Sequence, residues 1–417
     1  MTRIFDSGRN GPSTHAFVIG VADYPHAKPG LGTNEKLRQV RDLPSAADSA
    51  KRMVDWLIDN QDRLLPPLGT IELLISDVAG GAPRYVPRSP ELLKVVDRAD
   101  RDTIRPAGEA WMGQLEVHPG SSAFFYACGH GANYGTRPVL FHSDLNYGQM
   151  ATAYGHLNVG LMAQAFRQRN DLAAGYFFLD ACGEFVRDFP PDVRDDGFVA
   201  PGLPTTTDRD KVWLLSGASA ALLAYPGIDI DSPDPLEFDA ADAWPETGSA
   251  AAQPGPNHGV KLGRFTQTLI KGLDGASARW NGGGWSVDNM GLWSDLRLLH
   301  RAYFPSWRDK PFEPSEYLTP NDRYAIVTHE NPRFPILVSI DPTQRTAEFD
   351  LRIGLAHDGA GDPVDVRRER GSDPWLAHVN GDRTRPYYAL ALNETDPCRS
   401  SFFKAEQPHF DQKVPLA

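Results

Sequence analysis

Short apolar runs alternate with helical patterns along the first two-thirds of the chain. The first run, AFVIGVADY from Ala16, is continuous and rich in β-branched residues, which is typical of a strand covered on both faces. Similar runs predict strands at residues 71–75, 123–128, 176–179 and 212–215. Because helical patterns fall between several of these runs, we expect a mostly parallel sheet whose strands are joined by crossover helices.

Helices are predicted where apolar residues return every three or four positions. Residues 44–58 carry such a stripe, and Pro44 suits the first turn of a helix there. The same spacing predicts helices near residues 161–168, 265–273 and 292–303. We expect these helices to pack on the faces of the sheet.

The pattern changes at about Arg333, where the runs become short and are separated by Asp-Pro, Gly and Asn turns. ILVSI, AEFDLRI, PVDVRR and YYALAL show hardly any helical repeat. We therefore expect an α/β domain over residues 1–333, with a mostly parallel sheet flanked by helices, and a small sandwich-like β domain over residues 334–417.

Composition limits the partners and the cellular location that we expect for the protein. The 417 residues carry a formal net charge of −12 and three cysteines, and no apolar stretch approaches the ~20 residues of a membrane helix. An acidic balance disfavours nucleic acid and anionic membranes as partners, because both attract basic surfaces. Few cysteines suit a reducing compartment, and MTRIFDSGRNGPSTH lacks the apolar core of a secretory signal. The expected location is the cytoplasm.

Two reactive side chains follow predicted strands directly. FFYACGHG places His130 beyond one strand, and YFFLDACGE places Cys182 beyond the next. Sites of open parallel sheets lie at the carboxyl ends of strands, so a His130/Cys182 dyad is expected there, with His130 as general base and Cys182 as nucleophile. The backbone N–H groups of Gly131 and Cys182 are candidates for an oxyanion hole. A lone buried Cys is more often structural, and the hypothesis depends on the joint placement.

These motifs resemble those of the caspase-like cysteine peptidases, the class that includes caspases, metacaspases, paracaspases and bacterial relatives. Asp180-Ala181-Cys182-Gly183-Glu184 is similar to the caspase signature around the nucleophile, and His130 lies upstream at the spacing of that signature, about 50 residues. YACGHG, AFVIGVADY and GRFTQTLIKGL also resemble segments of that class. The resemblance implies a caspase-like fold and a cysteine-type endopeptidase, and it covers residues 14–333.

The resemblance also suggests which substrates are cut. Asp180 stands where caspases have Gln, and an acid there resembles metacaspases and paracaspases, which cleave after Arg or Lys. Asp23, after the first strand, matches a second pocket residue of those families. Ser216 and Gly217 occupy the position where such enzymes pair with the substrate backbone as an added strand. A capping carboxylate for Asp180, and an ordinary strand end for Ser216 and Gly217, remain alternatives.

Two segments suggest regulation. The stretch 183–210 contains Arg187, Arg194 and Arg209 and resembles the intersubunit linker of a latent enzyme, which implies a zymogen activated by self-cleavage, another protease or a different trigger. The stretch 228–246 carries seven acidic residues. It fits calcium binding, a funnel for basic substrates or a solvated loop, although its spacing is not that of an EF-hand.

Other activities find no support in the motifs. The chain lacks a GxGxxG run after a strand, a Walker A sequence and a GxSxG elbow. No second ligand pair at zinc spacing accompanies Cys128 and His130, so no metal is expected at the dyad and no cofactor is required. The alternative function is a catalytically inactive caspase-like scaffold that binds proteins.

Overall fold

The computed structural model describes most of the chain. The described residues are 2–27, 40–78, 82–86, 94–134, 137–147, 155–181, 211–217, 262–304, 312–355, 366–368, 374–393 and 400–416. The chain divides into two compact units: Met1–Gln267 with Glu313–Asp322, and Thr268–Phe312 with Arg323–Ala417. Each unit is described by itself.

A seven-stranded sheet organises the first unit. Its five central strands are parallel, and one antiparallel strand lies at each edge. Every residue of the three strands at its centre is buried, as the continuous apolar runs predict. In spatial order the strands are β1 (Arg3–Asp6), β3 (Leu68–Ser76), β2 (Thr14–Val21), β6 (Ser122–Gly129), β10 (Ala174–Ala181), β11 (Val212–Ser216) and β14 (Ser315–Leu318).

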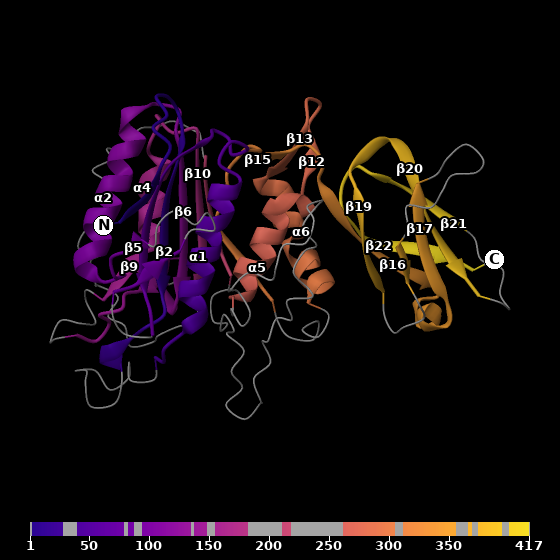
Figure 1. The fold of residues 1–417 in the computed structure, drawn as a ribbon, viewed down its shortest axis with the longest axis horizontal. Helices are drawn as coiled ribbons and strands as arrows, with labels where there is room; N and C mark the ends of the chain where they lie inside the picture. The colour runs from indigo at the N-terminus through magenta and orange to yellow at the C-terminus, as the bar shows by residue number, and fades with distance from the viewer. Residues whose placement is uncertain are drawn as a thin grey trace. The chain divides into compact units, whose positions relative to one another are not determined.

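Helices cover both faces of this sheet. Figure 1 shows α2 (Arg101–Val117) and α4 (Val159–Arg167) on one side and α1 (Pro44–Asp59) on the other. Pro44 lies in the first turn of α1, as predicted. The carboxylate of Asp100 caps α2 by accepting from the N–H of Thr103 at 3.1 Å. The sequence patterns did not predict α2, which contains Pro106, nor the edge strands β1 and β14.

Successive residues of each strand serve two separate cores. On the α2 and α4 face, Trp111 stacks on Phe166 at 5.0 Å between ring centroids and contacts Phe125 at 6.3 Å. On the α1 face, Trp56 stacks on Phe124 at 6.4 Å. Because Phe124 and Phe125 are adjacent in β6, their side chains point to opposite faces, and each aromatic core depends on the strand register.

The strand order creates a switch point. From β2 the chain moves to β3 on one side, and the later strands β6, β10 and β11 are added on the other side. In open α/β sheets, ligands bind beyond the carboxyl ends of the strands where the order reverses, which here means β2 and β6.

A second small sheet follows β6 directly. It consists of β7 (Gly131–Tyr134), β8 (Arg137–Phe141) and β9 (His156–Asn158), all antiparallel. The helix α4 begins at the end of β9, where the side chain of Asn158 accepts from the N–H of Leu161 at 2.9 Å. This arrangement attaches the β7–β8–β9 sheet to the end of β6, where the sequence predicts a site.

The remaining described elements of this unit are short. They are a two-stranded ladder of β4 (Arg84–Tyr85) and β5 (Lys94–Val95), and the helix η1 (Pro25–Ala27).

The second unit combines helices with small β sheets. Its first part contains η4 (Gly272–Ala276), which follows α5 (Arg264–Lys271), together with α6 (Asn289–Tyr303) and a sheet of β12 (Arg279–Trp280), β13 (Trp285–Asp288) and β15 (Ala325–His329). Its remaining sheets are β19 (Trp375–Asn380) with β16 (Arg333–Asp341) and β22 (His409–Pro415), and β18 (Val366–Arg368) with β17 (Asp350–Leu355), β20 (Asp382–Leu392) and β21 (Ser400–Ala405). A 3₁₀ helix, η6 (Thr343–Glu348), follows β16.

The predicted fold class, α/β with a mostly parallel sheet and small C-terminal β sheets, is confirmed. The second compact unit begins upstream of residue 333, because α6 and the β12–β13–β15 sheet belong to it. A functional division at residue 333 stays a prediction. Within the described residues, no helix is long and apolar enough to cross a membrane.

Candidate active site

Those predicted site residues that the structure describes lie at one end of the large sheet. The parallel register places Gly20 of β2, Cys128 of β6 and Asp180 of β10 in one row across the strands. The next strand follows the same row, because Leu179 pairs with Ser216 and Gly217 comes next. Asp23 lies three residues beyond this row along the chain, and His130 and Gly131 lie two and three residues beyond it, after the end of β6. The sheet thus brings together side chains from four strands that are distant in sequence.

His130 is held through its ring. Its Nε2 lies 2.8 Å from the carbonyl oxygen of Arg41. Because a carbonyl oxygen only accepts hydrogen bonds, Nε2 carries the hydrogen of the neutral imidazole. Nδ1 is then the basic nitrogen that can accept a proton. This is the arrangement that a general base needs.

The backbone of His130 is held as well. Its N–H donates to the hydroxyl of Tyr24 at 2.8 Å, and the two rings lie 5.1 Å apart. Tyr24 is fully buried at the end of β2, and its own N–H donates to the Asp42 carboxylate at 3.0 Å. A side chain at Gly129 would press on this hydroxyl, since a Cβ there would lie 3.0 Å from it. Sequence analysis did not identify Tyr24, Arg41 or Asp42, because a backbone carbonyl leaves no motif.

The protonation of His130 suits a base at neutral pH. Burial among protein atoms lowers the pKa of His130 below its ordinary value, although part of the side chain reaches solvent. The hydrogen bond to the Arg41 carbonyl and the negative charge of Asp42 act in the opposite direction. The imidazole is therefore neutral near pH 7, and its protonated form has a stabilising charge nearby.

Gly131 presents its N–H outside the β7–β8 ladder. The N–H of Phe141 donates to the carbonyl of His130 at 2.8 Å, so this opposed pair is hydrogen-bonded. Opposed pairs of antiparallel strands alternate between bonded and non-bonded, and Gly131 with Leu140 is the next pair. The N–H of Gly131 is therefore directed away from β8, which is what an oxyanion donor requires.

Asp180 is buried against the start of α5. Its Oδ2 accepts from the N–H of Thr266 at 3.2 Å and also from the Thr266 hydroxyl, which contacts the Tyr126 hydroxyl too. Burial raises the pKa of Asp180, while Thr266 and the positive charge of Arg264 lower it. Gly263 has no room for a side chain, since a Cβ there would meet this carboxylate. Asp180 therefore has a structural role as a cap of α5, whatever else it binds.

Asp23 has a different environment. Its Oδ2 lies 2.9 Å from Nη2 of Arg98, and its side chain is 12% exposed. The strand β6 lies between β10, which carries Asp180, and β2, which ends two residues before Asp23, so these two strands are about 10 Å apart. The structure brings the two acids to the same end of the sheet, with a protein cation near each.

Ser216 lies inside the sheet. It pairs with Leu179 of β10 on one side and with Ser315 of β14 on the other. The N–H of Gly217 donates to the Leu179 carbonyl at 2.8 Å. Addition of a substrate strand at these two residues stays a prediction, and any free pairing positions begin beyond Ser216.

Several predicted features lie outside the described residues. Cys182, the linker 183–210 and the acidic stretch 228–246 are among them. Cys128, by contrast, is buried in β6 opposite Asp180. In the part of the chain that the structure describes, no group of three or more His, Cys, Asp or Glu side chains is arranged to hold a metal ion.

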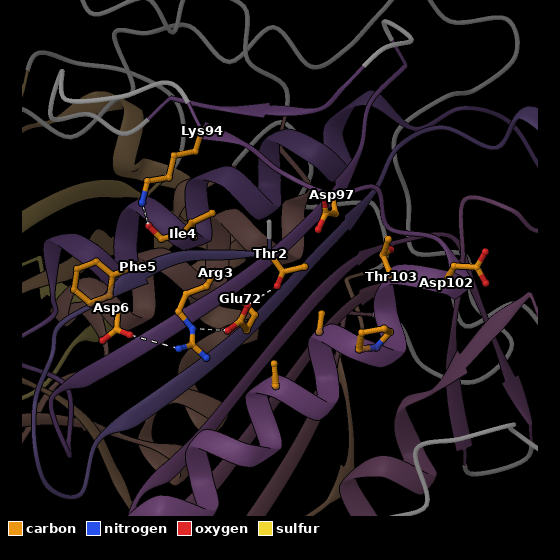
Figure 2. A pocket seen from close by; sticks show the side chains of 13 residues that line it. Thr2, Arg3, Ile4, Phe5, Asp6, Glu72, Lys94, Asp97, Asp102 and Thr103 are labelled. Carbon is orange, nitrogen blue, oxygen red and sulfur yellow. Dashed lines mark hydrogen bonds and ion pairs between the residues drawn. The ribbon is translucent and has the colours of Figure 1, made fainter.

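A cavity of about 840 Å³ lies elsewhere, at the β1 edge of the sheet. Figure 2 shows its floor, where Arg3 contacts Glu72 at 2.7 Å and Lys94 reaches the carbonyl of Ile4. One wall is the face of α2 that carries Thr103, and none of the predicted site residues lines the cavity. The cavity is therefore separate from the proposed site around His130.

Comparison with known proteins gives limited information. No protein-family model matches the chain. The chain is 29% identical over 127 residues to the uncharacterized protein y4kE of Sinorhizobium fredii, a match that covers 29% of this chain and 35% of that protein. The chain thus matches about a third of the length of this curated relative. The similarity indicates a distant relationship and names no activity.

Proposed function

We propose that the protein is a cysteine endopeptidase in which His130 is the general base and Cys182 the nucleophile. The observation that carries the proposal is the setting of His130 at the switch point of a parallel sheet. Its ring is oriented by the Arg41 carbonyl, so that Nδ1 is the basic nitrogen. The rings of His329 and His409 also contact backbone carbonyls, so the position at the switch point is what distinguishes His130.

Chain connectivity supports the choice of Cys182. Ala181 is the register partner of Gly129, and these residues directly precede Cys182 and His130. Consecutive α-carbons are about 3.8 Å apart, and paired strands are about 4.8 Å apart. The described end of β10 at Ala181 therefore lies beside Gly129, the last residue of β6 before His130. Cys128 lacks this relationship, because it lies within β6 itself.

The proposed reaction uses ordinary acyl-transfer chemistry. Nδ1 of His130 takes the thiol proton of Cys182, and the thiolate adds to the substrate carbonyl carbon. The resulting oxyanion accepts hydrogen bonds from the N–H groups of Gly131 and Cys182. The imidazolium then gives its proton to the leaving amine as the peptide C–N bond breaks. Water, deprotonated by His130, hydrolyses the thioester and restores the thiol.

We further propose cleavage after Arg or Lys, with Asp180 as the acid that selects the substrate residue. This rests on the resemblance to metacaspases and paracaspases and on the position of Asp180 two residues before Cys182. A substrate cation would compete with Arg264 for the carboxylate. Asp23, paired with Arg98, and the strand end at Ser216 and Gly217 are proposed to complete substrate binding. The resemblance also supports latency and activation by cleavage within residues 183–210.

The test compares identical fluorogenic peptides that end in Arg, Lys, Asp or Leu, with and without calcium. We expect cleavage after Arg or Lys, and its loss in Cys182→Ala and in His130→Ala. Cys128→Ala is the matched control and should retain turnover. Full activity of Cys182→Ala, or loss of activity only in Cys128→Ala, would show that the nucleophile is wrong. A folded protein without activity under all conditions, both intact and after proteolysis within residues 183–210, would favour the scaffold.

A further inference from the structure

The residues around His130 form a bracket that connects two segments distant in sequence. We define the His130 bracket as Tyr24, Arg41 and Asp42. We propose that Asp42 and Tyr24 are positioning residues for His130, which hold the ring and the backbone of the base in place. This inference rests on the proposed function and goes beyond it, because it assigns a role to two residues that the proposed reaction does not use.

Asp42 determines where the acceptor of the His130 ring lies. The segment before α1 is tied to the end of β2 by two hydrogen bonds. The N–H of Tyr24 donates to Oδ1 of Asp42 at 3.0 Å, and the N–H of Leu43 donates to the carbonyl of Ala22 at 2.7 Å. The Arg41 carbonyl that accepts from Nε2 of His130 is in the adjacent residue. Loss of the Asp42 tie would release that carbonyl on one side.

Tyr24 determines where the backbone of His130 lies. Its hydroxyl accepts from the His130 N–H at 2.8 Å, and its side chain is fully buried. The same residue therefore holds His130 through its hydroxyl and Asp42 through its N–H. The backbone and the ring of His130 are fixed by one connected set of hydrogen bonds, so a change in one arm displaces the other.

The negative charge of Asp42 also favours the step in which His130 becomes protonated. When His130 accepts the thiol proton it becomes an imidazolium, and a nearby carboxylate favours that state. The negative charge of Asp42 acts on His130 in this direction, because it raises the pKa of the imidazole. A carboxylate plays the same part in the Ser-His-Asp triad, where it contacts the imidazole directly. In this chain the imidazole contacts the Arg41 carbonyl, and Asp42 acts on it through its charge.

The first experiment does not depend on activity. In the Cys182→Ala background, the His130 ring is titrated by NMR in the full chain with and without Asp42→Asn. Removal of the negative charge should lower the pKa of His130. Glu109→Gln on the exposed face of α2, where Glu109 pairs with Arg105 at 3.1 Å, removes the same charge and should leave the His130 titration unchanged. Chemical-shift dispersion in the same spectra reports whether each variant is folded.

The second experiment measures turnover in the protein that retains Cys182. Asp42→Ala, which removes the acceptor of the Tyr24 N–H, and Tyr24→Phe should each lower kcat about ten- to a hundredfold, the cost of a misplaced catalytic group, with a smaller change in KM. In Asp42→Asn the acid limb of the kcat/KM profile should move to lower pH, because a base with a lower pKa stays neutral further into acid. Asp42→Glu keeps the charge and should keep that limb in place.

The outcomes separate the two proposals. If the wild-type protein cleaves peptides while Asp42→Asn matches it in titration and Asp42→Ala and Tyr24→Phe match it in kcat, the positioning proposal is wrong and the proposed function stands. If no peptide is cleaved but the NMR titration shifts in Asp42→Asn alone, the bracket stands and the peptidase proposal fails. If Asp42→Asn does not fold, Tyr24→Phe decides, and wild-type kcat in that variant overturns the inference.

Discussion

Two buried imidazoles in the β7–β8–β9 sheet should make the first unit sensitive to acid. His142 follows β8 and is 5% exposed, and His156 begins β9 and is 3% exposed. Burial, with smaller effects from the charges of His156 and Arg101, lowers the pKa of His142 to about 3. Burial lowers the pKa of His156 to about 4. Neither ring nitrogen of His142 has a hydrogen-bond partner among the described residues.

The sign of the effect follows from proton linkage. In the unfolded chain both rings have pKa values near 6.5, so the unfolded state binds more protons between that value and the lowered folded values. Their contribution to stability is complete above about pH 6.5 and is lost as the pH falls toward 4 and 3. At pH 5 each histidine has lost about 2 kcal/mol, and the pair about 4 kcal/mol, a large part of an ordinary 5–15 kcal/mol.

The assay is urea unfolding of wild type and His142→Gln at pH 7.5 and pH 5, followed by tryptophan fluorescence. Gln does not titrate, so the loss of stability between the two pH values should be smaller by about 2 kcal/mol in the variant. Leu140→Ala, a fully buried position in β8, is the control: it should cost about 2–5 kcal/mol equally at both pH values. An identical pH difference in wild type and His142→Gln would refute the reasoning.

Three further predictions concern the core and the substrate pocket. Trp111→Ala should destabilise the first unit by about 3–5 kcal/mol in urea unfolding, because the ring packs on Phe166 and its Nε1–H donates to the His15 carbonyl at 2.8 Å. Trp111→Phe should lower the free energy of unfolding clearly less. Equal losses in the two variants would contradict the packing argument. Asp180→Asn should reduce kcat/KM for cleavage after Arg about ten- to a hundredfold relative to cleavage after Leu, the loss of one charge-assisted hydrogen bond. Thr266→Val removes a donor that lowers the pKa of Asp180, so cleavage after Arg should be lost at a higher pH than in wild type, and superimposable pH profiles would count against that role.

The local pattern was sufficient for most elements of the sheet. The apolar runs at residues 16–21 and 123–128 became β2 and β6, which are buried along their whole length. The helix after Pro44 and the helix near residue 292 followed from periodicity. The helix α2 was missed because Pro106 interrupts its pattern, and β1 and β14 were missed because edge strands are short and half-polar. Their places depend on pairing with β3 and β11, which is long-range information.

For the candidate site as well, the sequence determined some features and the tertiary structure decided others. The sequence by itself determined which side chains can do chemistry, and that His130 and Cys182 directly follow strands, because hydrophobic runs and reactive residues are local properties. Only the tertiary structure decided that the carbonyl of Arg41 accepts from the His130 ring, that Tyr24 holds its backbone and that Asp180 caps α5. Those contacts join residues far apart in the chain through backbone groups that every residue type carries. No residue pattern predicts these contacts, because the residues that make them are brought together only by the strand order of the sheet.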